Sequence, residues 1–91
     1  MKIYVVMGIC GQYSDRTEWT VAAYKDREMA DAHADKASKI SMAYYKGLES
    51  RYVYNQDDLK EKLGEVDPNA CVDYTGTDWF VLEVPFLDKV P

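Results

Sequence analysis

A long amphipathic segment between two groups of β-like sequence most constrains how this chain of 91 residues can fold. Asp26 is a strong N-cap, Glu28 lies where the helix dipole favours a carboxylate, and neither Gly nor Pro interrupts before Gly47. We therefore predict a helix from about residue 27 to about residue 52. Its apolar side chains recur at intervals of three and four, as in a buried stripe. The stripe consists of Met29, His33, Ala37, Ile40, Tyr44 and Leu48.

Two strands are predicted before this helix, at residues 2–9 and 19–24, because both segments are rich in β-branched and aromatic residues. Side chains alternate between the two faces of a strand. In the first strand we expect one set to face the core, namely Ile3, Val5, Met7 and Ile9. The two strands form an antiparallel hairpin in this interpretation.

After the long helix, Asn55 is a credible N-cap for a shorter one. Leu59 and Leu63 give it an apolar edge, and Gly64 suits the left-handed position after its last turn. Residues 67–69, Asp-Pro-Asn, then break the chain.

The C-terminal part predicts a second hairpin. Residues 70–74 are a candidate edge strand, residues 75–78 its turn, and residues 79–87 the strongest strand pattern of the chain. Trp79 falls on one face of that strand and a set of apolar residues on the other. Pro85 cannot donate to a ladder, so this strand should lie at an edge of the sheet. The apolar set is Phe80, Leu82, Val84 and Phe86.

These elements predict a single α+β domain over residues 1–91, in the order β-β-α-α-β. The fold is a two-layer sandwich in which one long and one short helix cover one face of an antiparallel sheet of three or four strands. A crossover through the long helix would return the last strand beside the first. The expected spatial order is therefore second, first, last.

The charge distribution disfavours direct binding to nucleic acid. The net charge is −5, and it divides into +1 for residues 1–54 and −6 for residues 55–91. Affinity for DNA or RNA comes largely from cations that neutralise phosphates, and no basic stripe compensates for the acidic half. No apolar run approaches the roughly 18 residues of a membrane helix, and no export signal is evident. We expect a cytoplasmic protein.

The two cysteines and the single histidine do not predict a metal site. Zinc signatures use close ligand pairs, whereas Cys10, His33 and Cys71 are scattered singly. We interpret the cysteines as buried or half-buried thiols, with a structural disulfide as the alternative. His33 lies on the helix stripe, which favours a packed imidazole. No cofactor is predicted.

The linker between the first two strands is the main candidate for a binding site. Residues 11–19 are longer than a hairpin needs and carry an aromatic residue, acids, a base and hydroxyls. No histidine is available to activate its hydroxyls, and its carboxylates lie in a polar loop, so an enzyme is not indicated. Several of the eight tyrosines also exceed what a small core can bury, which suits either an interface or a covering of the open side of a small sheet. The candidate binding residues are Tyr13, Ser14, Asp15, Arg16, Glu18, Trp19, Tyr74 and Asp78.

Three segments resemble a family of small uncharacterised proteins encoded by tailed phages and prophages. They are Gly-Gln-Tyr-Ser-Asp-Arg-Thr-Glu-Trp at residues 11–19, Ala-Ala-Tyr at residues 22–24 and Asp-Tyr-Thr-Gly-Thr at residues 73–77. The resemblance covers both ends of the chain and brings no catalytic residues. It implies a bacterial cytoplasm during infection and an accessory protein that acts on host or phage machinery.

The leading hypothesis is a non-enzymatic accessory protein that binds a host or phage protein, including inhibition of host defence. In that case acidic side chains could occupy a basic channel of the partner: Asp57, Asp58, Glu61, Glu65 and Asp67. A second hypothesis is a small-molecule or nucleotide site under the long loop, with Ser14, Asp15 and Arg16 as polar contacts. The third is a homo-oligomer that associates through a strand edge and an open sheet face.

Overall fold

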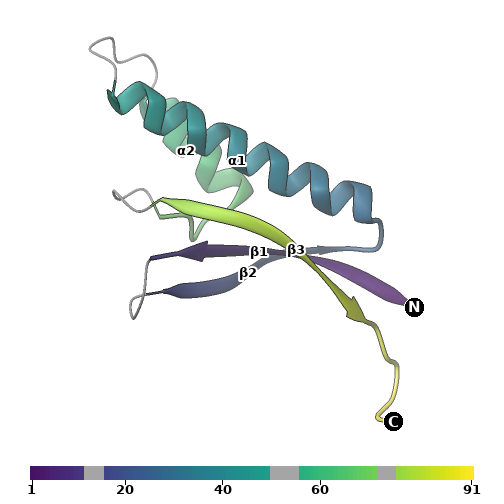
Figure 1. Ribbon diagram of the computed structural model, residues 1–91. Coiled ribbons are helices and arrows are strands. Elements are labelled where there is room, and N and C mark those ends of the chain that lie inside the picture. The colour runs from purple at the N-terminus through teal and green to yellow at the C-terminus, as the bar shows by residue number, and fades with distance from the viewer. Residues whose placement is uncertain (12–15, 50–55, 72–75) are drawn as a thin grey trace.

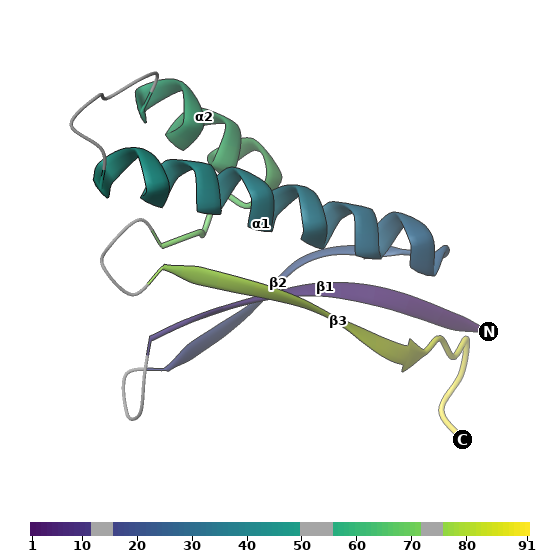
Figure 2. The same cartoon turned by 45° about the horizontal axis from the view of Figure 1, so that its top comes forward.

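The computed structural model describes residues 1–11, 16–49, 56–71 and 76–91 (Figure 1). These residues form β1 (Lys2–Cys10), β2 (Thr17–Tyr24), α1 (Arg27–Glu49), α2 (Gln56–Val66) and β3 (Thr77–Pro85). Both helices lie on the same side of one sheet, as the two views show (Figures 1 and 2). The predicted two-layer α+β architecture and the element order β-β-α-α-β are confirmed.

The sheet has the predicted spatial order, β2-β1-β3, with both outer strands antiparallel to β1. Gly8 at the centre of β1 is paired with Trp19 on one side and Trp79 on the other. A bulge interrupts the β1–β2 ladder between Val6 and Met7. The strand β3 begins at Thr77, so residues 77 and 78 belong to the strand rather than to the predicted turn.

The predicted core face of β1 is wrong. Val6, Gly8 and Cys10 are the buried residues of this strand and face the helices, whereas Ile3, Val5, Met7 and Ile9 lie on the opposite face. Apolar residues occupy both faces of β1, so alternation alone does not choose between them. Gly8 decides the choice, because a Cβ built there would lie 2.6 Å from the indole of Trp19. Only glycine leaves room for that ring beneath the helices.

The predicted cap of α1 is confirmed, but its predicted stripe is partly wrong. The backbone N–H of Glu28 donates to the Asp26 carboxylate at 2.9 Å. The buried positions are Ala30, Ala37 and Ser41, while Met29 is 60% exposed. The helix turns its small side chains to the sheet because these permit close approach, and this rotates the buried stripe by about one position from the one predicted.

The α2 helix is held by Leu63, whose side chain is 1% exposed. Gly64 does not end this helix as predicted: it lies inside the helix, which continues to Val66. Among the described glycines, the positive φ angles occur at Gly11 and Gly76. The predicted N-cap Asn55, the last predicted turn of α1 and most of the predicted strand 70–74 lie outside the described residues. The chain does turn at residues 68–69, as the Asp-Pro-Asn sequence predicted.

Cys10 and Cys71 form a disulfide, so their interpretation as thiols is wrong. Cys10 ends β1, and Cys71 follows the turn after α2, which brings two positions 61 residues apart into contact. The backbone of Cys71 is held further by the hydroxyls of Thr77 and Tyr45, with an N–H to Thr77 Oγ1 distance of 2.7 Å. This junction attaches the end of α2 to the sheet.

His33 is a packed imidazole, as predicted. Its Nε2 lies 2.7 Å from the carbonyl oxygen of Val66, and its Nδ1 lies 2.7 Å from the hydroxyl of Tyr24. Because a carbonyl can only accept, Nε2 carries the hydrogen, and in the neutral ring Nδ1 accepts from Tyr24. One side chain thus joins β2, α1 and the end of α2.

Candidate protein-interaction surface

The face of the sheet that points away from the helices is apolar, and no described segment covers it (Figure 2). The strand registers arrange its side chains in rows across the three strands. We call this surface the open sheet face. It consists of Ile3, Val5, Met7 and Ile9 of β1, Thr20 and Ala23 of β2, and Phe80, Leu82 and Val84 of β3.

The large apolar side chains of this surface differ in how far they are accessible to solvent. Leu82 is exposed, and the others are half-buried: Ile3, Val5, Met7, Ile9, Phe80 and Val84. Leu82 is 44% exposed, and Phe86, just beyond β3, is 52% exposed. The N–H of Phe86 donates to the carbonyl of Met1 at 2.9 Å, which continues the ladder by one residue and keeps Phe86 on the same face. Contiguous exposed apolar surface of this kind marks an interaction site in a soluble domain.

One end of the open sheet face is acidic. Ile9 is flanked by Glu18 on β2 and by Asp78 on β3. Arg16 donates to the Glu18 carboxylate at 3.2 Å, and both side chains are about half exposed or more. An exposed pair of this kind contributes little to stability, so its charges remain available to a partner.

The predicted binding residues divide into three groups. Tyr13, Ser14, Asp15 and Tyr74 lie outside the described residues. Arg16, Glu18 and Asp78 are exposed and lie together at the acidic end of the open sheet face. Trp19 instead turns toward the helices and is half-buried there.

Trp19 belongs to a buried hydrogen-bond network that the sequence did not reveal. Its Nε1 donates to the Asp67 carboxylate at 2.9 Å, and Nε1 of Trp79 donates to the same oxygen at 2.9 Å. The backbone N–H of Asn69 donates to the other oxygen at 3.0 Å. Asp67 is 1% exposed, so it cannot serve as an acidic contact for a basic partner, as the sequence had suggested.

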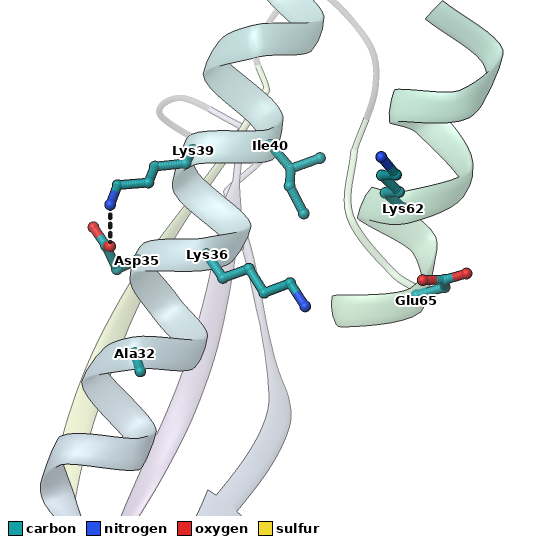
Figure 3. A pocket seen from close by; sticks show the side chains of 7 residues that line it. All are labelled: Ala32, Asp35, Lys36, Lys39, Ile40, Lys62 and Glu65. Carbon is teal, nitrogen blue, oxygen red and sulfur yellow. Dashed lines mark ion pairs between the residues drawn. The ribbon is translucent and has the colours of Figure 1, made fainter. Parts of the chain in front are cut away.

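A cavity of about 600 Å³ lies between α1 and α2 (Figure 3). Lys36 of α1 extends into it, and Lys62 and Glu65 face it from α2. Lys39 at its margin is 2.8 Å from Asp35, and the hydrogen bond and charge of this carboxylate raise the pKa of Lys39. The lining mixes both signs of charge. Its described lining holds no hydroxyl or thiol beside a base.

The remaining described side chains add no metal site, since they contain no group of three or more His, Cys, Asp and Glu residues placed to hold an ion. Of α1 and α2 as described, neither is long and apolar enough to cross a membrane. Comparison of the chain with protein families, with curated proteins and with solved structures found no match.

Proposed function

We propose that this chain is a non-enzymatic protein-binding module and that the open sheet face is its interface. The observation that carries the proposal is the uncovered apolar surface formed by all three strands. Both faces of β1 are apolar, but the helices pack against only one. A sheet buried on a single face normally alternates apolar and polar residues, whereas strands buried on both faces read as continuous apolar runs. The sequence of β1 is of the second kind.

The small interior of the isolated chain supports the same proposal. Hydrophobic residues make up 47% of the sequence. The fully or nearly buried ones among the described residues are few and mostly small: Val6, Cys10, Ala30, Ala37 and Leu63. Larger apolar side chains, Leu82 and Phe86 among them, remain exposed. Leu82 and Phe86 are already about half buried, so a partner that buried one of them fully would add about half of the usual 1.5–3 kcal/mol, roughly 1 kcal/mol.

The resemblance to small phage proteins, which rests on the sequence alone, gives this proposal a biological setting. A host or phage protein in the bacterial cytoplasm would then be the target of the assembled module. Arg16, Glu18 and Asp78 supply a charged rim at the end of the apolar surface, the arrangement typical of protein interfaces. Three of the binding residues predicted from the sequence, Arg16, Glu18 and Asp78, therefore belong to the proposed interface.

Affinity capture from bacteria that co-express a tagged and an untagged copy tests the proposed function. We expect the wild-type chain to retain a protein, whether the untagged copy or another chain, and Leu82→Glu to lose it. Met42→Lys is the matched control, because Met42 is also an exposed apolar residue, at 71%, but lies on α1. Retention that is the same for wild type, Leu82→Glu and Met42→Lys would contradict the proposal.

A further inference from the structure

We infer that the open sheet face binds a second copy of this chain, sheet against sheet, about a two-fold axis. The inference rests on the proposed function and names its immediate partner. The resulting dimer is a four-layer assembly, with the helices outside and two three-stranded sheets inside. Packed sheets lie about 10 Å apart and bury the side chains of their facing surfaces.

The exposed area of the chain is the first argument. It exposes 6888 Å². A folded monomer of 10.5 kDa is expected to expose only about 5,400 Å². The excess of about 1,500 Å² is summed over the whole surface, including the exposed residues 85–91, and it leaves room for the roughly 800 Å² that each partner buries in a standard stable interface. The radius of gyration, 15.1 Å, likewise exceeds the value of about 12 Å expected for a compact domain of this length.

The distribution of charge is the second argument, because it suits self-association. The rows of described residues around Val5 and Met7 hold no charged side chain, so two copies can bring these rows together without burying a charge. The carboxylates of Glu18 and Asp78 lie only at the Ile9 end. A two-fold axis perpendicular to the strands places the acidic ends of the two copies at opposite ends of the interface. An axis along the strands would bring four carboxylates and only two Arg16 guanidinium groups together, and the excess of like charge disfavours it.

The edges of the sheet favour this face-to-face arrangement over edge-to-edge pairing. The β2 edge of the sheet contains the bulge opposite Val6 and Met7, and the edge strand β3 ends at Pro85. Bulges and prolines are features that prevent the addition of a strand. Two chains therefore gain more contact through the open sheet face than by extending the ladder.

Light scattering coupled to size exclusion tests the inference on the full chain, with and without reductant to exclude dimers joined through sulfur. We expect wild type and Met42→Lys to have twice the mass of one chain, and Leu82→Glu and Phe86→Glu to have the mass of one. Both altered residues are exposed in the single chain, so the variants should keep its circular dichroism. Phe86 lies beyond β3, which makes Phe86→Glu informative even if Leu82→Glu does not fold.

A monomeric wild type would overturn the inference, as would a dimer that persists in both variants. If wild type is monomeric yet Leu82→Glu alone loses a captured protein of another sequence, only the choice of partner fails and the proposed function stands. Nitroxide labels on Asp78→Cys test the orientation of the axis. The perpendicular axis predicts a separation on the order of the 30 Å length of a nine-residue strand. A much shorter distance would contradict it.

Discussion

Replacing Asp67 by Asn keeps the size of the side chain but removes one acceptor oxygen from the buried network. In the wild-type chain three N–H groups donate to this carboxylate: the indoles of Trp19 and Trp79 and the backbone of Asn69. The two indoles share Oδ2, whereas Asn69 donates to Oδ1, which Trp19 also reaches at 3.1 Å. An amide supplies one oxygen and one NH₂ group. In either orientation of the amide, its NH₂ group therefore faces at least one of the N–H donors that the carboxylate accepts from in the wild-type chain.

The magnitude follows from which bonds are lost. If the amide oxygen faces the indoles, the bond to Asn69 is lost, and a buried bond to a charged group contributes about 1.5–3 kcal/mol. In the opposite orientation the amide oxygen still accepts from Asn69 and from Trp19, which lies 3.1 Å from that position, but the N–H of Trp79 loses its acceptor and faces the amide NH₂ group. We therefore expect Asp67→Asn to lower the free energy of unfolding by about 2–4 kcal/mol. With about 4–8 °C of Tm per kcal/mol for a domain of this size, the Tm falls by at least about 8 °C.

Thermal unfolding at one fixed protein concentration measures this effect. Trp19 and Trp79 are the two tryptophans of the chain, so their fluorescence reports the environment of the network directly. Asp57→Asn is the matched control, because Asp57 is an exposed acid of α2, and its Tm should change little. If Asp67→Asn and Asp57→Asn melt at the same temperature as wild type, the carboxylate does not hold the two strands to the helix layer.

Two further predictions concern backbone positions and the disulfide. Gly8→Ala puts a methyl group 2.6 Å from the Trp19 ring and should lower the free energy of unfolding by about 1–3 kcal/mol. Gly64→Ala meets no atom within 4 Å and should raise the free energy of unfolding by about 0.5–1 kcal/mol. Equal urea midpoints for the two variants would contradict this contrast. Cys71→Ser opens the link to Cys10 across 61 residues, and chain entropy predicts a loss of about 4 kcal/mol. Urea titration of wild type with and without reductant should show the same loss, and coincident curves would refute it.

The strand and helix order could be predicted from the sequence because each element carries its own local pattern. The Asp26 cap, the alternation of residues 2–9 and the edge-strand proline are signals that a few neighbouring residues provide. The Asp67 network has no such signal, since Trp19 lies 48 positions away and Trp79 lies 12 away. The disulfide likewise joins distant positions. Contacts of this kind depend on the tertiary fold, which local patterns do not determine.

Only the part of the candidate site that depends on local sequence could be predicted. Arg16, Glu18 and Asp78 are polar residues at the end of a predicted hairpin, and exposure follows from that position. Trp19 was expected beside them as a contact residue, but an indole next to a glycine can turn inward, and here it does. The open sheet face was recognised only as an alternative, because its apolar residues had been assigned to the core.

That wrong assignment has a physical meaning. Ile3, Val5, Met7 and Ile9 have the composition of a buried face, and they lie opposite Val6, Gly8 and Cys10, which the helices do bury. A strand with two apolar faces gains the full stabilisation from burial only when both faces are covered, and two helices on one side can cover only one. The residues misread as the core of the single chain are therefore those expected in the core of the assembly. The proposal of a second protein layer on this face therefore rests mainly on the sequence pattern of β1, and the large exposed area of the whole chain is compatible with it.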